Sequence, residues 1–523
     1  MRSCIPFRRG LVSCLLASAA ILPSPALARQ ADAPTGTGTA NAPELVSVTG
    51  DRLARWVPKD SSAATKTDQP LITTPESVSV VTRAQMDEQN ARTLGEALRY
   101  TAGVASEADR GYSTRYDLVS IRGFQSNGDQ YLDGLRLFGG AYYAVQKIDP
   151  FLLDGYQVLK GPPSVLYGQS SPGGIIALTP KAPTAARVRD AEIEGGTFGY
   201  VRGTADLGGR IDENGHWLFR LPVTGTTSGS QDRNTHTDTV AAMPSLSWLP
   251  TDRDTLTVTG LVQWDPRGGD YDTAPIQGTI LPNPNGRFEN DYYPGDNKFE
   301  TFDQTQAAIG YRYEHRFNPD WSFRSLGRYA NVGEQYRQVY GTGILDADLR
   351  TDQRYTAASK EHFDTITLEQ QLLGHVDTGP VRHALLFGVN WQNLRDHYNF
   401  YGGTAPSIDA FAPNNDQPIP APTLSLDRGV STNQEGLFAQ DEMVLGRLHG
   451  QVGVREDWSE IATRDVLSPA TGTDQGDRAF TWRAGILYAF PQGVSPYFNY
   501  ARSFQPTNQT DFFGTPFKPT RGE

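Results

Sequence analysis

The chain of 523 residues has only two cysteines, Cys4 and Cys14, and both lie among its first 28 residues. From residue 29 onward the sequence therefore has no disulfide, no thiol nucleophile and no cysteine metal site. No run of roughly 18 apolar residues occurs after Ala28, which excludes a membrane protein built from helices. The formal net charge of −12 also argues against a surface that binds nucleic acid.

Motifs for catalysis and metal binding are also missing. The sequence has no His-Glu-x-x-His, no Gly-x-Ser-x-Gly and no phosphate-binding Gly-Lys-Ser/Thr loop. Its eight histidines are scattered, and His315, His375 and His383 fall on predicted strands without the spacing of paired metal ligands. We therefore predict a protein that is not an enzyme, has no catalytic residues and needs no cofactor or metal site of its own.

Residues 1–28 have the pattern of a signal peptide. Arginines at positions 2, 8 and 9 precede an apolar run over 11–22, and Ala26-Leu27-Ala28 is a small-x-small cleavage site. The apolar run is too short to span a bilayer as a helix. Export suits a mature chain without cysteine, because stray thiols are oxidised outside the cytoplasm.

From Arg189 onward, apolar residues recur at every second position, as over 309–317, 385–391 and 480–488. About thirteen such strands are predicted, centred near residues 193, 204, 220, 244, 260, 309, 328, 369, 388, 438, 454, 484 and 499. Strands with one apolar and one polar face that end in Trp, Tyr or Phe are typical of a transmembrane β-barrel. A soluble β-sandwich also alternates, so the period alone leaves that alternative open.

Before residue 185 the pattern mixes helix and strand. A short strand is predicted over 77–81, and two pairs have the spacing of capping boxes: Thr82 with Gln85, and Thr93 with Glu96. The second predicted helix has one apolar face, made of Leu94, Ala97 and Leu98, and Gly103 is its expected stop.

The same region carries a series of short motifs. They are Thr74-Pro75-Glu76-Ser77-Val78, Ile121-Arg122-Gly123-Phe124, Tyr131-Leu132-Asp133-Gly134, Ile148-Asp149-Pro150, Lys160 to Gly168, and Ser171-Pro172-Gly173-Gly174. At this spacing the series resembles the plug domain of TonB-dependent outer-membrane receptors, specifically the ferric-siderophore branch. The resemblance implies an all-β transmembrane barrel, plugged by an N-terminal α+β plug domain, in the outer membrane of a Gram-negative bacterium.

On that resemblance the chain divides into a signal peptide (1–28), a disordered arm (29–69), a plug domain (70–184) and a partial barrel (185–523). The implied function is to bind a ferric siderophore outside the cell and import it with energy coupled through TonB. The implied partners are the siderophore, TonB of the inner-membrane complex and outer-membrane lipid, and the protein is expected to be a monomer.

A β-prone island lies within the arm at residues 44–50. Read alone, Glu44, Leu45, Val46, Ser47, Val48 and Thr49 are an accidental Val/Thr cluster or a strand-forming tag. Ahead of a plug, they resemble the TonB box that pairs with an edge strand of the periplasmic partner.

The resemblance also points to residues that contact the chelate. Arg110 matches the loop arginine of hydroxamate-siderophore receptors, and Tyr142 and Tyr143 match the loop tyrosine, with Tyr143 the better match. Gly128 and Gln130 belong to the remaining apical loop, and Tyr271 is a candidate from the barrel side. A guanidinium can donate forked hydrogen bonds to chelating oxygens, and aromatic rings can cover an amphipathic ligand. The structural alternative is a solvated arginine and tyrosines that pack the plug against the barrel.

Arg122 and Lys160 match two basic residues that pair with barrel carboxylates in the family and lock the plug in place. Lys160 stands where arginine is usual, so a bidentate contact is not expected there.

Family barrels have about 22 strands, and only about 13 are predicted here, so we expect the chain to be truncated at its C-terminus. An open sheet would expose unpaired backbone groups to lipid. The alternatives are uptake of another chelate such as haem or cobalamin, a passive porin or adhesin barrel without a TonB box, and a non-functional remnant.

Overall fold

The computed structural model describes residues 56–67, 69–106, 115–126, 128–269, 274–507, 511–513, 515 and 517–523. Most of these residues form strands, and two sheets dominate: one of 14 strands and one of five. Within the described residues, no helix has the length and apolar character that crossing a membrane requires. The predicted TonB box at 44–49 lies outside the described residues.

The smaller sheet belongs to the N-terminal part of the chain. Its strand order is β3 (Ser77–Thr82), β9 (Leu153–Lys160), β10 (Gly174–Pro180), β7 (Gln130–Leu132) and β8 (Leu135–Leu137). Only the β10–β7 pair is parallel. Around the sheet lie α2 (Arg83–Glu88), α3 (Leu94–Leu98), α4 (Ser164–Tyr167) and the short elements β1 (Asp60–Ser61), β2 (Gln69–Pro70), η1 (Leu71–Thr73), β4 (Val104–Ala105), β5 (Ser120–Ile121), β6 (Phe124–Gln125) and η2 (Pro150–Leu152).

Side-chain caps start both predicted helices. Thr82 and Gln85 form a complete capping box at α2. At α3 the Thr93 side chain accepts from the Glu96 N–H, whereas the Glu96 carboxylate reaches the Arg92 N–H rather than that of Thr93. The helix ends at Leu98 and not at Gly103, whose positive φ instead serves the turn that leads into β4.

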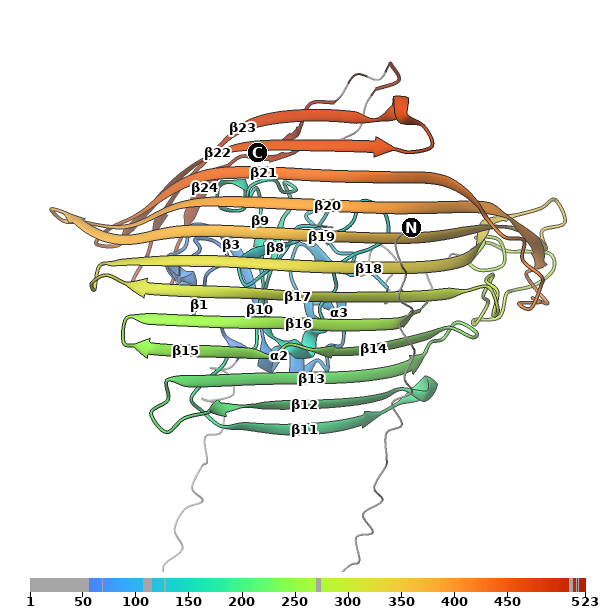
Figure 1. Ribbon diagram of the computed structural model, residues 1–523, viewed down its shortest axis with the longest axis horizontal. Helices are drawn as coiled ribbons and strands as arrows, with labels where there is room; N and C mark the ends of the chain where they lie inside the picture. The colour runs from blue at the N-terminus through green and yellow to red at the C-terminus, as the bar shows by residue number, and fades with distance from the viewer. Residues whose placement is uncertain are drawn as a thin grey trace, which may run out of the picture. The chain divides into compact units, whose positions relative to one another are not determined.

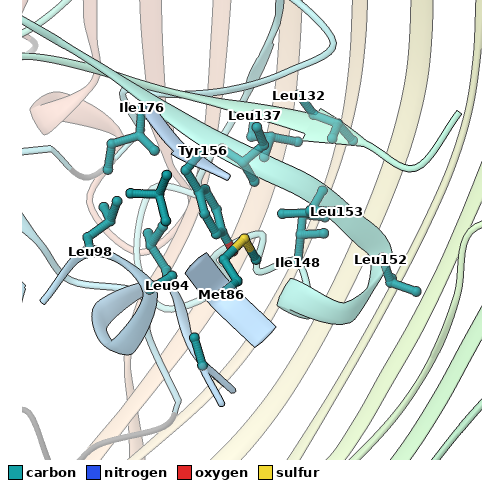
Figure 2. Packing of buried hydrophobic residues seen from close by; sticks show 14 of the residues in the cluster. Met86, Leu94, Leu98, Leu132, Leu137, Ile148, Leu152, Leu153, Tyr156 and Ile176 are labelled. Carbon is teal, nitrogen blue, oxygen red and sulfur yellow. The ribbon is translucent and has the colours of Figure 1, made fainter. Parts of the chain in front are cut away.

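The predicted apolar face of α3 is buried in the core of this small domain. Leu94 and Leu98 pack with Met86 of α2 and with Tyr156 and Ile176 of the sheet, as Figure 2 shows. Because all five side chains are at most 1% exposed, this domain has a hydrophobic core of its own.

The larger sheet is antiparallel throughout, and its strands follow chain order from β11 to β24, except that β14 and β15 both lie between β13 and β16 (Figure 1). They are β11 (Val188–Gly195), β12 (Val201–Arg210), β13 (Trp217–Gly229), β14 (His236–Ala242), β15 (Ser245–Thr251), β16 (Asp254–Gly268), β17 (Thr301–Arg316), β18 (Trp321–Leu345), β19 (Thr351–Thr378), β20 (Val381–Asp409), β21 (Thr423–Leu445), β22 (Leu448–Asp465), β23 (Thr473–Tyr488) and β24 (Tyr497–Ala501). The remaining elements are η3 (Thr197–Gly199), η4 (Pro469–Thr471), β25 (Ser503–Gln505) and β26 (Thr520–Gly522).

The predicted strand positions are confirmed. Twelve of the thirteen predicted centres fall inside one strand each, and residue 244 falls between β14 and β15. Pro244 lies at this break, since proline has no N–H to donate to the ladder.

Solvent exposure along the strands decides between barrel and sandwich. Ile309 and Phe480 on the apolar faces are each 59% exposed, while Gln306 and Thr481 on the polar faces are each 2% exposed. A soluble sandwich buries its apolar faces between two sheets. Here the apolar face is outside and the polar face is buried, as in a barrel that faces lipid.

Candidate ligand-binding site and plug–barrel contacts

A tight loop between β8 and η2 carries the predicted tyrosines. Its base is a β-bridge between Gly139 and Val145, and the Gly140 N–H donates to the Ala144 carbonyl oxygen at 2.6 Å. The chain therefore folds back on itself within a few residues. Tyr142 and Tyr143 lie at the tip of this hairpin, which we call the plug loop (139–145), and both side chains are half-buried.

Both tyrosines join an aromatic cluster with the barrel. Tyr142 stacks on Tyr398 of β20, with ring centroids 4.9 Å apart and planes 8° apart, and its centroid lies 5.1 Å from that of Phe400. Tyr143 meets Tyr336 of β18 edge to face at 4.8 Å. Such arrangements contribute about 0.5–1.5 kcal/mol each beyond their buried area.

An arginine that the sequence reasoning did not select lies beside these rings. The Arg115 guanidinium is 4.9 Å from the ring centroid of Phe302 and 5.3 Å from that of Tyr336. It donates to Gln338 Oε1 at 2.9 Å and to the Gly269 carbonyl oxygen at 3.0 Å. A cation held over aromatic faces and hydrogen-bonded to the barrel fixes this edge of the plug.

The outward faces of the strands place the cluster beyond the lipid-facing band. Along β20, the outward Phe387 and Val389 are apolar, but the outward residues further along are Arg395 and His397. Tyr398 therefore lies beyond the apolar band, toward the long connection from Asp409 to Thr423. Long connections in such barrels are extracellular and short turns are periplasmic, so the cluster is on the extracellular side.

The other predicted ligand residues are placed differently. The Gly128 carbonyl oxygen accepts from Arg136 Nε at 2.7 Å, and Gln130 is buried in β7. No contact among the described residues connects either of them with Tyr142 or Tyr143. Arg110 and Tyr271 lie outside the described residues.

The predicted lock residues make no ion pair with the barrel in the described part of the chain. Arg122 is exposed, and Lys160 Nζ donates to the Ala102 carbonyl oxygen at 2.8 Å. Partial burial and the nearby Arg122 lower the pKa of Lys160. The ammonium group of Lys160, the last residue of β9, therefore binds within the plug.

Other residues of the plug, and Lys66 of the predicted arm, form ion pairs with the barrel; residues 56–67 of that arm are ordered and contain strand β1. The ion pairs are Lys66 with Glu369, Glu76 with Arg483, Asp133 with Arg312, Asp149 with Arg202, and Lys181 with Asp206. Four of the five pairs have both side chains less than 9% exposed. Removing one partner of a buried pair leaves an uncompensated charge, so these contacts hold the plug in a specific orientation.

The histidines make no metal centre in the described residues, where no group of three or more His, Cys, Asp or Glu could hold an ion. His315 binds Asp254 through Nδ1 at 2.7 Å, and His383 binds Asp441 at 2.8 Å. Each joins neighbouring strands of the barrel.

The fold is a small sheet domain packed against the polar face of a lipid-facing barrel. This arrangement is that of a plugged outer-membrane receptor. Two family descriptions match: the TonB-dependent receptor plug domain over residues 70–175, and the TonB-dependent receptor-like β-barrel over 244–523. The second covers more than half of the chain, which therefore belongs to the TonB-dependent receptor family and to the outer membrane.

Curated relatives agree with this assignment. The chain is 35% identical over 465 residues to the ferrioxamine B receptor of Salmonella typhimurium strain SL1344, covering 88% of this chain and 66% of the relative. It is 31% identical over 498 residues to the ferrichrome outer membrane transporter/phage receptor of Escherichia coli K12, covering 89% and 66%. The chain thus spans about two thirds of the length of these relatives.

Solved structures show the same fold at lower identity. The closed form of the ferric-catecholate import receptor Fiu from E. coli K12 superposes with a TM-score of 0.79 at 20% identity, covering 89% of this chain and 72% of that one. The pyoverdine outer membrane receptor FpvA from Pseudomonas aeruginosa PAO1 gives 0.76 at 20% identity, covering 89% and 68%.

Proposed function

We propose that this protein is an outer-membrane receptor that binds a ferric siderophore and imports it into the periplasm with energy coupled through TonB. The proposal is supported by the family and by the names of relatives at 31–35% identity, which are receptors for ferrioxamines and ferrichrome. Iron would enter as the chelate, so the siderophore is a substrate and not a cofactor. No covalent bond is made or broken by the protein.

The observation that carries the proposal is the shared surface of Tyr142, Tyr143 and Phe400. Two of these half-buried rings belong to the plug loop and one to the barrel, and all lie on the extracellular side. A ligand that rests on them touches plug and barrel at once. Binding outside the cell could then be sensed by the plug, as TonB-coupled import requires.

We further infer that the siderophore is of the hydroxamate type. A ferric hydroxamate combines an apolar periphery with chelating oxygens, which suits aromatic rings next to a guanidinium. Arg110, from the resemblance, is proposed to supply that guanidinium, with Tyr142 and Tyr143 as the ring contacts. Gly128, Gln130 and Tyr271 are secondary candidates.

The energy-coupling side of the proposal rests on the residues Glu44 to Thr49. They would pair as an added strand with TonB, whose pull would displace the plug. The protein would act as a monomer surrounded by outer-membrane lipid, without contact with nucleic acid.

Equilibrium binding of ⁵⁵Fe-loaded ferrioxamine B and ferrichrome to the purified protein tests this function. We expect saturable binding of at least one of them. Tyr142→Ala should raise the Kd of that chelate at least tenfold, and Tyr142→Phe should leave it nearly unchanged. Tyr100→Ala is the matched control, because Tyr100 is a plug tyrosine that is 79% exposed and outside the cluster. Equal affinity of the Tyr142→Ala and Tyr100→Ala variants would remove the plug loop from the site.

A further inference from the structure

We propose that Glu361 of β19 is a positioning residue that holds the plug loop in its binding geometry by accepting hydrogen bonds from successive backbone N–H groups. The role in ligand binding rests on the function proposed above. The clamp itself is a feature of the ligand-free protein and can be tested without any siderophore.

The contacts between Glu361 and the loop are made by main-chain atoms. The Tyr142 N–H donates to Glu361 Oε1 at 2.8 Å, and the Ala144 N–H donates to Oε2 at 2.6 Å. The Tyr143 N–H donates to Oε2 as well. Three consecutive N–H groups thus converge on one carboxylate, a concave arrangement that proteins use to bind anions.

A second acid extends the clamp by one residue. The Ala141 N–H donates to Asp396 Oδ2 at 2.6 Å, and Asp396 lies two residues before Tyr398, the ring on which Tyr142 stacks. Two barrel carboxylates therefore satisfy four successive N–H groups of the loop.

Gly140 of the plug loop leaves the space that the Glu361 carboxylate occupies. A Cβ atom added at Gly140 would lie 2.8 Å from Glu361 Cδ and 3.0 Å from the Ala144 carbonyl oxygen, both closer than ordinary contacts. A Cβ atom added at Gly139 would meet nothing within 4 Å. Of these two adjacent glycines, only Gly140 must lack a side chain for Glu361 to reach the loop backbone.

The charge of Glu361 is compensated by these N–H groups and not by a basic side chain. Within the described residues no Lys or Arg forms an ion pair with it, and Glu334 of β18 lies directly opposite in the strand register. Both acids are buried, at 3% and 2% exposure. The three loop N–H groups, together with the neighbouring Asp396 carboxyl group, are therefore the partners that stabilise this carboxylate.

The clamp fixes the part of the plug that carries the ligand-contacting rings. Without it, the four N–H groups of residues 141–144 would lose their acceptor oxygens, and Tyr142 would no longer be held parallel to Tyr398. A ligand would then have to order the loop on binding, which lowers affinity. Glu361 thus acts on the ligand through Tyr142 and Tyr143.

Hydrogen–deuterium exchange of the ligand-free protein, followed on peptides that contain residues 139–146, tests the clamp. Glu361→Gln leaves one acceptor oxygen and places an NH₂ group against N–H donors, so we expect these amides to exchange at least tenfold faster. Gly140→Ala should do the same with the carboxylate in place. Gly139→Ala, the matched control, should exchange like the wild type, and peptides from β19 and β20 should be unchanged in all variants.

Unchanged exchange of residues 141–144 in Glu361→Gln would overturn the clamp. If that variant does not assemble, unchanged exchange in Gly140→Ala would overturn it instead. Siderophore affinity is measured separately, and we expect Kd to rise at least tenfold in Glu361→Gln. Faster exchange with an unchanged Kd would overturn the positioning role. Faster exchange in a protein whose wild type binds no siderophore would support the clamp and remove the proposed function.

Discussion

The ring of Tyr142 in the plug lies parallel to the ring of Tyr398 in barrel strand β20, with centroids 4.9 Å apart. These residues are 256 positions apart in the chain, and Tyr398 is only 4% exposed. The stack therefore ties the orientation of a plug side chain to a rigid strand of the barrel. It also explains why a substitution in the barrel is expected to change the plug loop.

A double-mutant cycle on Tyr142→Ala and Tyr398→Ala should show coupling. The expected interaction free energy is about 0.5–1.5 kcal/mol, the range for aromatic pairs, measured by urea unfolding in detergent micelles. Strict additivity of the two losses would show that the rings do not stabilise each other. Tyr142→Ala combined with Phe512→Ala is the control cycle, because Phe512 is 97% exposed and makes no contact with the cluster.

Lys66→Met should destabilise the protein by about 3–5 kcal/mol, because it leaves Glu369 as an unpaired buried charge. Lys66 Nζ binds Glu369 Oε1 with both side chains at most 5% exposed, and the ammonium group lies 4.9 Å from the Tyr167 ring centroid. The measurement is the free energy of unfolding in urea. The double variant Lys66→Met/Glu369→Gln should recover much of the loss, and a double variant as unstable as the single one would contradict the account.

Charge removal should cost more at Glu76, which pairs with the barrel, than at Lys160, which binds within the plug. Glu76→Gln is expected to cost about 2–4 kcal/mol, since Glu76 pairs with Arg483 and accepts from Asn499 Nδ2 at 2.7 Å, in a buried setting. Lys160→Met should change stability by less than about 0.5 kcal/mol, because it removes only a half-exposed bond to a carbonyl oxygen. Thermal unfolding of the two variants compares them, and a larger loss for Lys160→Met would contradict this account and support the predicted lock.

Asp129 of the plug should make the free energy of unfolding depend on pH. Burial raises the pKa of this carboxyl from 3.8 to about 6, although Ser171 donates a backbone N–H to it at 3.2 Å. The folded state thus binds the proton more tightly than the unfolded state. The stabilisation by protonation is complete below about pH 4 and is lost as the pH rises through about 6.

Asp129→Asn should therefore be more stable than the wild type at pH 7.5, by about 1–3 kcal/mol, and equal to it near pH 4. The difference in unfolding free energy between the two proteins at the two pH values isolates this group from other titrations. An advantage that is the same at both pH values would show that Asp129 is already ionised without cost in the folded protein.

The barrel strands could be predicted because most of them are long and alternate in polarity. The two helix starts could be predicted because Thr82 and Thr93 are local signals. Strand alternation and helix capping both depend on residues that are close in the chain, so the sequence pattern is enough to predict them. The sequence predicts that the second helix stops at Gly103, whereas α3 ends at Leu98. A glycine can end a helix or form a separate turn, and the sequence alone does not distinguish the two.

Contacts between plug and barrel could not be predicted in the same way. The family resemblance points to Lys160 and Arg122, but the ion pairs of this protein depend on how the plug lies against the strands, which brings Glu76 to Arg483 and Lys66 to Glu369. Arg110 stays a prediction from the resemblance, whereas the contacts of Arg115 with Phe302 and Tyr336 depend on how the plug lies in the barrel. An inward-facing acid such as Glu361 had one available signal: its alternation with the outward residues His362 and Lys360 on a predicted strand.

Uptake of ⁵⁵Fe-labelled siderophore by iron-starved cells that carry the gene, with and without residues 44–49, tests the central claim most directly. The account predicts saturable uptake of a ferric hydroxamate that falls to background when these residues are deleted, while surface binding of the chelate is retained. Uptake that is unaffected by the deletion would contradict energy-coupled import and indicate passive flow through the barrel.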